Sequence, residues 1–486
     1  MLKKRGRRNI KEQMVTENIK KKQIMIIEQL YTNCLAEAAY YIESEGEAAI
    51  IDPIRETTPY LQKLQTRNAK LKFVFETHFH ADFVSGHIDL ASKTGAQIVF
   101  GPLADTKYKS YGAKDGEIFT VGKVKIKVLH TPGHTPESSC YLLTDEKGKE
   151  YCIFTGDTLF VGDVGRPDLL DGKMTKEELA GMMYDSLNTK LKTLADDVIV
   201  YPAHGPGSAC GKNIGKETWS TIGQQKKTNY AMQDMSKEKF IGLVASGLTA
   251  PPQYFFSDAA INKNGYNNID NVLSQNTHAL SIPDFKNAVQ SGALILDSRN
   301  ADDFEKGFIS GSMNIGLNGQ YAIWAGTLID IKQPLVIVAD KGKESESILR
   351  LARVGYENVA GYLEGGIENW KQNGNTVDLI SSVTPQVFAD VVNNNQTTVL
   401  DVRKPSEYEG GHVKEADNIE LAQLNASISS LDKNKTYHIH CAGGYRSMIA
   451  ASIMKANGFN NIVNVYGGYG KIKETNVPTE SSIPVS

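Results

Sequence analysis

Short apolar runs of strand length recur along this chain, and three of them end in turns that carry metal-binding side chains. LKFVF (71–75) leads into THFHAD, VKIKVL (124–129) into TPGHTPES, and CIF (152–154) into TGD. Such runs beside turn residues predict strands. Imidazole and carboxylate ligands suit zinc, iron or manganese. We therefore expect a metal site where five side chains converge at one end of a sheet: His78, His80, Asp82, His134 and Asp157.

A helical pattern begins at Thr175. Thr175 and Glu178 have the spacing of a capping box, in which each side chain caps the other residue's backbone N–H. The apolar positions that follow are three and four residues apart, which predicts a helix with one face in the core. These positions are Leu179, Met183, Leu187, Leu191 and Leu194.

Near the C-terminus, the strand-like HIH (438–440) delivers Cys441 to the loop CAGGYR. The run MIAASIM and the later Gly458 predict a helix that Arg446 opens. Loop amides, the helix N-terminus and the charge of Arg446 all favour a thiolate at Cys441. The pattern indicates a nucleophile that holds a negative or persulfidated sulfur.

The chain contains an internal repeat, because LDSRNADDFEKGFISGSMNI (296–315) matches LDVRKPSEYEGGHVKEADNI (400–419) without a gap. In the first copy, the stretch that corresponds to the Cys441 loop is VIVADKGKESESILRL (336–351). It contains no cysteine, and Asp340 lies near the place of the nucleophile. A carboxylate cannot take up sulfane sulfur, so we expect the first copy to be catalytically silent.

The composition is that of an ordinary globular protein. The net charge of −3 gives no sign of nucleic-acid binding, and no apolar run reaches membrane-spanning length. Five cysteines without CxxC spacing, one of which must be a free thiol, indicate a reducing compartment, so we expect a cytoplasmic protein. Residues 1–24 form a basic tail without an apolar core, which excludes a secretory signal. Either this tail is disordered or the true start is Met25.

With YPAHG (201–205), the three N-terminal motifs resemble the metallo-β-lactamase superfamily over residues 25–268. The resemblance implies an αββα sandwich. Binuclear members, such as glyoxalase II hydrolases, read HxHxDH, and the last His binds a second metal. Here Phe83 stands in that place and cannot donate a lone pair, so we expect a mononuclear site.

The mononuclear branch that the sequence resembles is the persulfide dioxygenases. That resemblance implies one Fe(II) per chain, held by His78, His134 and Asp157, as in the facial triad of non-haem iron oxygenases. His80 and Asp82 would then orient the ligands by hydrogen bonds.

Two further segments look like the active-site loops of this branch, GRPDL (165–169) and the stretch from Tyr201 to Asn213. Arg166 either holds a loop through a carboxylate or meets an anionic substrate. Tyr201 either bonds a persulfide or is a half-buried strand tyrosine. We expect His204 to line the pocket, and Cys210 is either a transient sulfur carrier or an ordinary loop cysteine.

The C-terminal part resembles rhodanese sulfurtransferases, because CxxxxR is their loop spacing and the related phosphatases have one residue more. The resemblance implies two rhodanese-like α/β domains, an inactive one at 275–376 and an active one at 381–486. Cys441 and Arg446 would be catalytic, and the remaining loop residues would bind sulfur: Ala442, Gly443, Gly444 and Tyr445.

Together these resemblances imply that a low-molecular-weight thiol persulfide, RSSH, is oxidised with O2 to sulfite and RSH. Cys441 would pass sulfane sulfur to sulfite and form thiosulfate. Alternatively, the transfer would run in the reverse direction, and thiosulfate would supply persulfide to the iron. We also expect a homo-oligomer. Two alternatives stay open: a zinc thiolester hydrolase of glyoxalase II type fused to a sulfur carrier, and a non-enzymatic, sulfide-responsive scaffold.

Overall fold

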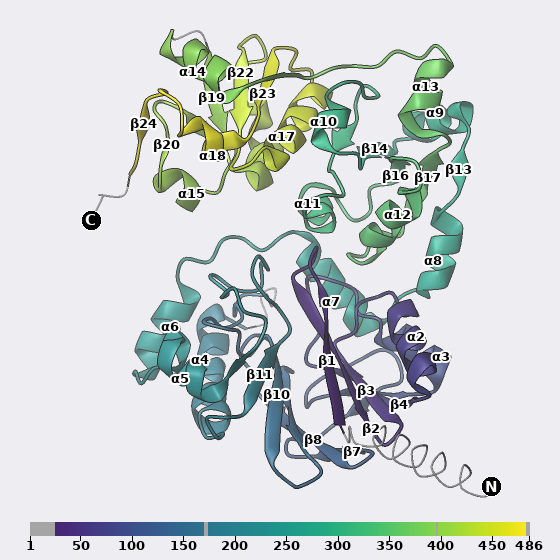
Figure 1. Cartoon of the computed structure of the whole chain (residues 1–486), viewed down its shortest axis with the longest axis vertical. Coiled ribbons are helices and arrows are strands. Elements are labelled where there is room, and N and C mark those ends of the chain that lie inside the picture. The colour runs from purple at the N-terminus through teal and green to yellow at the C-terminus, as the bar shows by residue number, and fades with distance from the viewer. Residues whose placement is uncertain (1–24, 170–173, 395–396, 483–486) are drawn as a thin grey trace, which may run out of the picture. The chain divides into compact units, whose positions relative to one another are not determined.

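The computed structural model describes residues 25–169, 174–394 and 397–482, so the basic tail predicted at 1–24 lies outside the described residues. Contacts divide the chain into two compact units, Met1–Ile269 and Asp270–Ser486 (Figure 1). Among the described residues, no helix combines the length and the apolarity that a membrane crossing requires.

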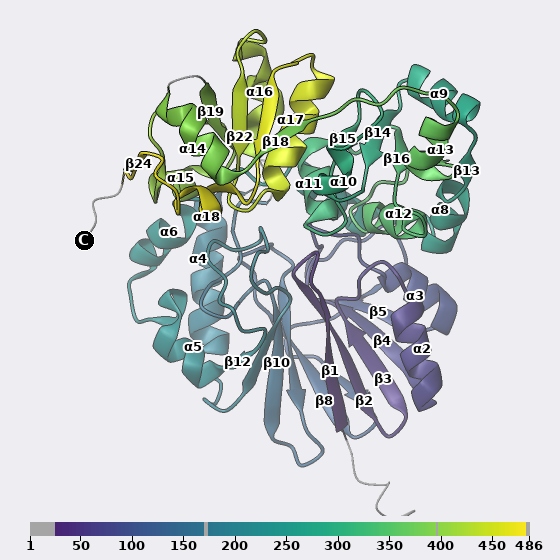
Figure 2. The same ribbon diagram turned by 45° about the horizontal axis from the view of Figure 1, so that its top comes forward.

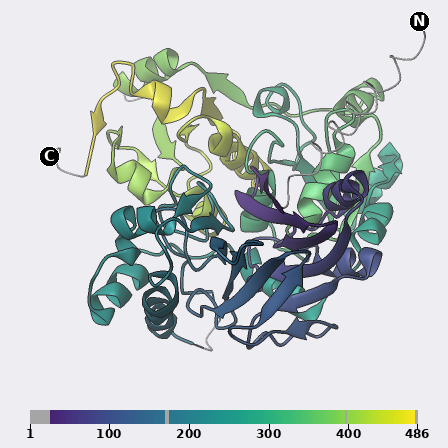
Figure 3. The same cartoon turned by 60° about the horizontal axis from the view of Figure 1, so that its bottom comes forward.

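Two six-stranded sheets form the N-terminal unit, in the orders β1-β2-β3-β4-β5-β6 and β12-β11-β10-β9-β8-β7. The core between them draws apolar side chains from both, including Tyr40, Phe75, Tyr141 and Phe154. Helices α2 and α3 cover the outer face of the first sheet, and α4, α5 and α6 cover that of the second (Figure 2, Figure 3). This is the predicted αββα sandwich.

The strands of the first sheet are β1 (Met25–Thr32), β2 (Glu37–Ser44), β3 (Glu47–Ile51), β4 (Lys70–Glu76), β5 (Gln97–Phe100) and β6 (Tyr111–Gly112). Those of the second are β7 (Ile118–Val121), β8 (Val124–His130), β9 (Ser139–Thr144), β10 (Glu150–Gly156), β11 (Ile199–Pro202) and β12 (Ser220–Thr221). The helices are α2 (Thr58–Arg67), α3 (His87–Thr94), α4 (Lys176–Ser186), α5 (Ile222–Thr228), α6 (Lys237–Ala245) and α7 (Tyr254–Asn264).

Helix α4 confirms the capping-box prediction. Thr175 Oγ1 accepts from the backbone N–H of Glu178, and the Glu178 carboxylate accepts from that of Thr175. The predicted apolar positions are all buried. The α-helix ends at Ser186, however, and Leu187–Leu191 continues as a π-helical turn.

The C-terminal unit contains two five-stranded parallel sheets of the same topology, β13-β17-β16-β14-β15 and β18-β23-β22-β19-β21. The first consists of β13 (Ala279–Leu280), β14 (Leu294–Asp297), β15 (Met313–Asn314), β16 (Leu335–Val338) and β17 (Val359–Leu363). The second consists of β18 (Ser381–Val383), β19 (Thr398–Asp401), β21 (Asp417–Asn418), β22 (Tyr437–His440) and β23 (Ile462–Val465). A small pair, β20 (His412–Val413) and β24 (Thr479–Glu480), stands apart.

The helices of this unit are α8 (Ile269–Asn276), α9 (Ile282–Gln290), α10 (Ala301–Phe304), α11 (Tyr321–Leu328), α12 (Glu344–Ala352), α13 (Gly366–Gln372), α14 (Pro385–Asn393), α15 (Pro405–Glu409), α16 (Leu424–Ser427), α17 (Tyr445–Ala456) and α18 (Gly468–Ile472).

The repeated DxR motif has the same structural role in both copies. Arg299 donates to the buried Asp297 carboxylate and to the carbonyl of Gly307 (3.0 Å). Arg403 makes the corresponding bonds to Asp401 and to the carbonyl of Gly411 (2.8 Å). A buried carboxylate requires such a partner, which accounts for the presence of this motif in both copies.

Candidate functional site

His78, His134 and Asp157 meet in a buried group, and their ligand atoms all lie within 4.8 Å of one another. His78 follows β4 of the first sheet, whereas His134 and Asp157 follow β8 and β10 of the second. The expectation that these residues share the end of one sheet is therefore wrong. The two sheets pack face to face, and the ends of strands from both supply the group.

Hydrogen bonds orient the two imidazoles. His134 Nδ1 donates to the carbonyl of Arg166 at 2.8 Å, which turns Nε2 toward Asp157 Oδ2 at 3.4 Å. His78 Nδ1 lies 3.0 Å from Thr77 Oγ1, and its Nε2 lies 3.9 Å from Asp157 Oδ2. Burial, reinforced by the neighbouring histidines, holds the pKa of His78 well below its ordinary value, so this imidazole is neutral, as a metal ligand must be.

The inner atoms of this group have no hydrogen-bond partner. They are His78 Nε2, His134 Nε2 and both carboxylate oxygens of Asp157, all buried. Buried lone pairs without partners are costly and rare in folded proteins. A bound cation would satisfy all four, so the residues fit a metal ion with two imidazole ligands and one carboxylate ligand.

Gly165 allows the chain to pass close to these ligands. A Cβ at this position would lie 2.2 Å from the carbonyl oxygen of Asp157 and 2.9 Å from His134 Nδ1. Only glycine fits there, which explains the G of GRPDL.

His80 and Asp82 belong to a neighbouring group. His80 Nε2 lies 3.1 Å from Asp52 Oδ1 and 3.5 Å from Glu76 Oε2. Asp82 Oδ2 lies 3.4 Å from His204 Nε2, which in turn is 3.5 Å from Asp157 Oδ1. His80, Asp82 and His204 also present ligand atoms within 4.8 Å of one another, so this second group touches the first through Asp157.

Phe83, which directly follows Asp82, packs against the metal-binding motif. Its side chain is fully buried, and its ring lies 4.4 Å from that of His80. A hydrocarbon ring therefore packs where the binuclear pattern places an imidazole.

Sequence reasoning missed three residues that hold the motif in place. Asp52 accepts from both the N–H (2.7 Å) and the hydroxyl (2.8 Å) of Thr77. Asn262 of α7 donates to the carbonyls of His80 (2.8 Å) and Phe83 (2.7 Å). For Asp52 and Glu76 a signal existed, since each ends an apolar strand with a carboxylate. No such signal marks Asn262, because the residues it contacts lie about 180 positions away along the chain.

Arg166 is buried, and its guanidinium is occupied by the protein. It makes a bidentate pair with Asp168 at 2.6 and 2.8 Å. It also donates to the carbonyls of Ala209 (3.3 Å) and Thr249. These contacts favour the loop-holding alternative over contact with an anionic substrate.

Tyr201 packs as a strand tyrosine. Its ring stacks on Phe154 at 5.6 Å and contacts Tyr40 at 5.2 Å in the core between the sheets. Burial, with the nearby Cys152 and Tyr151, raises the pKa of Tyr201 to about 12. This environment favours the packing alternative.

Cys210 lies beside the metal-binding group. Its sulfur falls within 4.8 Å of ligand atoms of Asp157 and His204, and its carbonyl accepts from the N–H of Arg166 at 2.9 Å. Burial, then the Asp82 and Asp157 carboxylates, raise the pKa of its thiol well above the ordinary value.

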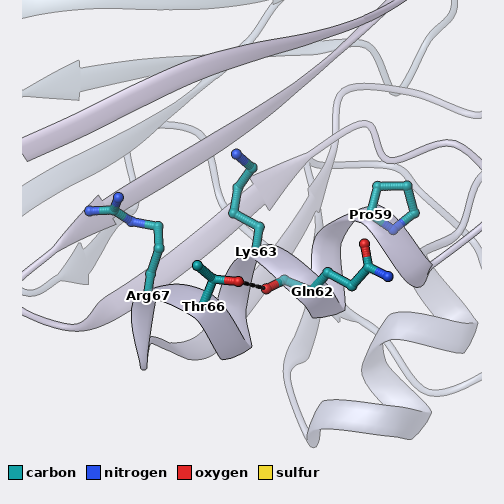
Figure 4. A pocket seen from close by; sticks show the side chains of 5 residues that line it. All are labelled: Pro59, Gln62, Lys63, Thr66 and Arg67. Atoms are coloured by element: carbon teal, nitrogen blue, oxygen red, sulfur yellow. Dashed lines mark hydrogen bonds between the residues drawn. The ribbon is translucent and has the colours of Figure 1, made fainter.

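A surface hollow of about 320 Å³ runs along α2 and offers no competing site (Figure 4). Its lining contains no carboxylate, imidazole or thiol, and its two cations are already paired, Lys63 with Glu28 and Arg67 with Glu43. The lining residues are Pro59, Gln62, Lys63, Thr66 and Arg67.

In the C-terminal unit, Cys441 follows β22 directly, and α17 begins at Tyr445, one residue before the predicted Arg446. The backbone N–H of Gly444 donates to Cys441 Sγ at 3.1 Å, and Ser447 Oγ lies 3.8 Å from it. An amide at a helix N-terminus thus stabilises negative charge on the sulfur. The loop residues Ala442 and Gly443 are exposed to solvent.

Among the described residues, Arg446 makes its side-chain hydrogen bonds to a carboxylate and none to the Cys441 sulfur. Its guanidinium makes a bidentate pair with Glu407 of α15 at 2.7 and 2.8 Å. The turn after β23 closes the back of the loop, where Gly468 has φ +54° and a Cβ would lie 2.3 Å from the carbonyl oxygen of Cys441. Only glycine permits this approach.

The strand register shows which residue of the middle domain stands at the place of Cys441. His440 pairs with Asp401, and Val338 pairs with Asp297 in the same way. Ala339 therefore stands at the place of Cys441, one residue earlier than the expected Asp340. Five residues further on, Glu344 replaces Arg446, which also reverses the charge.

Comparison with known proteins agrees with this geometry. The Metallo-beta-lactamase superfamily pattern matches residues 32–204, and the Rhodanese-like domain pattern matches 281–373 and 384–475. A metallo-β-lactamase structure from Staphylococcus aureus is 33% identical, with a TM-score of 0.63, and the match covers 70% of this chain and 99% of that one.

Two curated relatives of the metallo-β-lactamase domain are named for different activities. A probable hydroxyacylglutathione hydrolase of Schizosaccharomyces pombe is 30% identical over 226 residues, which is 41% of this chain and 84% of the relative. The human persulfide dioxygenase ETHE1 is 29% identical over 214 residues, which is 43% of this chain and 76% of the relative. The predicted architecture is confirmed: the chain belongs to the metallo-β-lactamase superfamily and carries two rhodanese-like domains after its metallo-β-lactamase domain.

Proposed function

We propose that the N-terminal unit is a mononuclear non-haem Fe(II) persulfide dioxygenase and that Cys441 transfers sulfane sulfur. The observation that carries this proposal is the group of His78, His134 and Asp157, whose buried inner atoms have no partner within the protein. The buried Phe83, at the place of a second-metal ligand, supports a single metal. The similarity to the human persulfide dioxygenase supports the choice of chemistry.

The overall reaction is RSSH + O2 + H2O → RSH + H2SO3, in which the terminal sulfur is oxidised and O2 is reduced. Bound Fe(II) supplies the electron-transfer chemistry that allows O2 to react with the persulfide sulfur. His78, His134 and Asp157 would hold this iron, a donor set of two imidazoles and one carboxylate that suits non-haem Fe(II). Thr77 and the carbonyl of Arg166 fix the imidazole rings through Nδ1, so both Nε2 atoms point inward.

The sulfur-transfer step uses the thiolate of Cys441. It attacks the terminal sulfur of RSSH, which breaks the S–S bond, releases RSH and leaves Cys–S–S⁻. Sulfite then attacks this terminal sulfur, thiosulfate leaves and the thiolate is regenerated. The Gly444 N–H, 3.1 Å from Sγ, stabilises the thiolate that attacks and is regenerated.

Oxygen uptake with glutathione persulfide as the probe tests the proposal. Wild-type protein should consume one O2 for each molecule of sulfite or thiosulfate formed, and His134→Ala should lose both iron and uptake. His130→Ala is the matched control, because His130 lies four residues earlier and bonds only the carbonyl of Pro136 (2.8 Å) with its ring. Loss of uptake in the control, or full uptake in His134→Ala, would contradict the assigned ligands.

A second candidate function is that of a zinc thiolester hydrolase. The pair of Asp82 and His204 beside Asp157 favours it, because these three side chains are where a second metal would bind. The similarity to hydroxyacylglutathione hydrolases points the same way. Hydrolysis of S-lactoylglutathione without oxygen uptake would favour this alternative.

A further inference from the structure

Two segments of the active rhodanese-like domain determine where the Cys441 sulfur lies. The first is the loop 441–446, whose Gly444 N–H donates to Sγ. The second is the turn after β23, where the N–H groups of Tyr469 and Gly470 donate to the carbonyls of Cys441 (2.6 Å) and Ala442 (3.0 Å). Any displacement of either segment therefore moves the sulfur relative to the amide that stabilises its charge.

The first segment is bonded to the silent middle domain. The hydroxyl of Tyr445 donates to the carbonyl of Gly316 at 2.7 Å. The Tyr445 ring lies against Gly319, where a Cβ would approach ring atom Cζ to 2.4 Å. Arg350 of α12 fixes this part of the middle domain by donating to the carbonyl of Leu317 at 2.8 Å.

The second segment is bonded to the same domain through a different residue. Glu305 is buried, and its carboxylate accepts from the hydroxyls of Tyr466 and Ser382. Tyr466 directly precedes the two glycines that close the back of the Cys441 loop. A third contact comes from the buried Ser452 of α17, whose hydroxyl accepts from the N–H of Asn314 at 2.9 Å. Helix α17 lies beside α10 and α11 in both views (Figure 1, Figure 2).

We propose that the silent middle domain positions the nucleophile of its neighbour, with Tyr445, Tyr466 and Glu305 as the positioning residues. This inference rests on the proposed sulfur transfer at Cys441. The middle domain has Ala339 and no thiol at the place of Cys441, yet it contacts both segments that surround Cys441. Its role in sulfur transfer is thus to hold a catalytic loop in another domain.

The test uses the full-length protein and two conservative variants. Tyr445→Phe removes only the hydroxyl that reaches Gly316, and Glu305→Gln weakens the bonds to Tyr466 and Ser382. Lys455→Ala is the matched control, because Lys455 pairs with Asp378 (3.2 Å) at the far end of α17. Thermal unfolding verifies that the C-terminal unit of each variant is folded.

Two readouts separate positioning from mere stability. With thiosulfate and cyanide as substrates, each positioning variant should lower kcat about fivefold, because the loss of one hydrogen bond corresponds to about that change in rate. The KM for thiosulfate should change less than about twofold. Alkylation of Cys441 by iodoacetamide, followed by peptide mass spectrometry, should slow about threefold. The control should match the wild type in both.

The outcomes distinguish this inference from the proposed function. Wild-type protein that cannot turn over thiosulfate or persulfide would contradict sulfur transfer at Cys441, and alkylation rates alone would then decide the positioning role. Wild-type kcat and alkylation rate in both Tyr445→Phe and Glu305→Gln would overturn the inference. An equal loss of kcat and alkylation rate in Lys455→Ala would also overturn the inference. The effect would then come from any weakened contact between the two domains and not from the positioning of Cys441.

Discussion

At the scale of single residues, the position of a side chain decides between roles that its chemistry leaves open. Arg166 could be assigned to a substrate from its charge alone, but all of its observed bonds go to the protein. The same holds for Tyr201, whose ring packs in the core. We therefore propose that both residues support the site by holding the loops and strands that carry the ligands.

Replacement of Arg166 by Lys tests that role. Lysine keeps the charge but cannot form the bidentate pair with Asp168, so the N-terminal unit should lose about 2 kcal/mol of stability. The KM for persulfide should change less than about threefold. Thermal unfolding and oxygen-uptake kinetics check this. A KM raised tenfold at unchanged stability would instead place Arg166 in contact with the substrate.

At the scale of elements, local patterns predicted the strands and turns well. Strands β4 and β8 end where their motifs begin, β10 extends two residues into TGD, and α4 begins at its capping box. The distribution of ligands over two sheets was not predictable, because strand pairing joins residues far apart in the chain. Asn262 was missed for the same reason, since nothing in its own segment marks the contact with the HFHAD turn.

The cap of α4 provides a test at this scale. Thr175→Ala removes the side-chain acceptor for the Glu178 N–H and should destabilise the N-terminal unit by about 1 kcal/mol. Oxygen uptake at low temperature should be unchanged, because α4 supplies no ligand. Denaturant unfolding measures the effect. Thr189→Ala serves as the control, since Thr189 is exposed and bonds only within its own turn. Equal losses in the two variants would show that the cap contributes nothing specific.

At the scale of the whole molecule, the repeat predicted two related domains and the absence of a thiol in the first. What the sequence did not predict is that the middle domain contacts both segments around Cys441. Those contacts involve the carbonyl of Gly316 and the carboxylate of Glu305, and no sequence motif marks either residue. Only the packing of two sheets with equal topology places them near the loop.

The two chemistries should be separable within the full chain. Cys441→Ser should keep oxygen uptake on glutathione persulfide and release sulfite, whereas the wild type should accumulate thiosulfate. A serine hydroxyl is a poor nucleophile toward sulfane sulfur, and Ala339 cannot substitute for it. The variant should also form no thiocyanate from thiosulfate and cyanide. If it makes thiosulfate at the wild-type rate, another residue is the carrier, and Cys210 becomes the leading candidate.

The measurement that tests the central claim most directly is the metal requirement of persulfide oxidation. Metal-free protein is titrated with Fe(II) under anaerobic conditions, and oxygen uptake with glutathione persulfide is measured after each addition. We predict that uptake rises linearly and reaches its maximum at one Fe(II) per chain, and that Zn(II) gives no uptake. A chain that needs two metal ions, or that hydrolyses S-lactoylglutathione with Zn(II) and consumes no oxygen with Fe(II), would contradict the account.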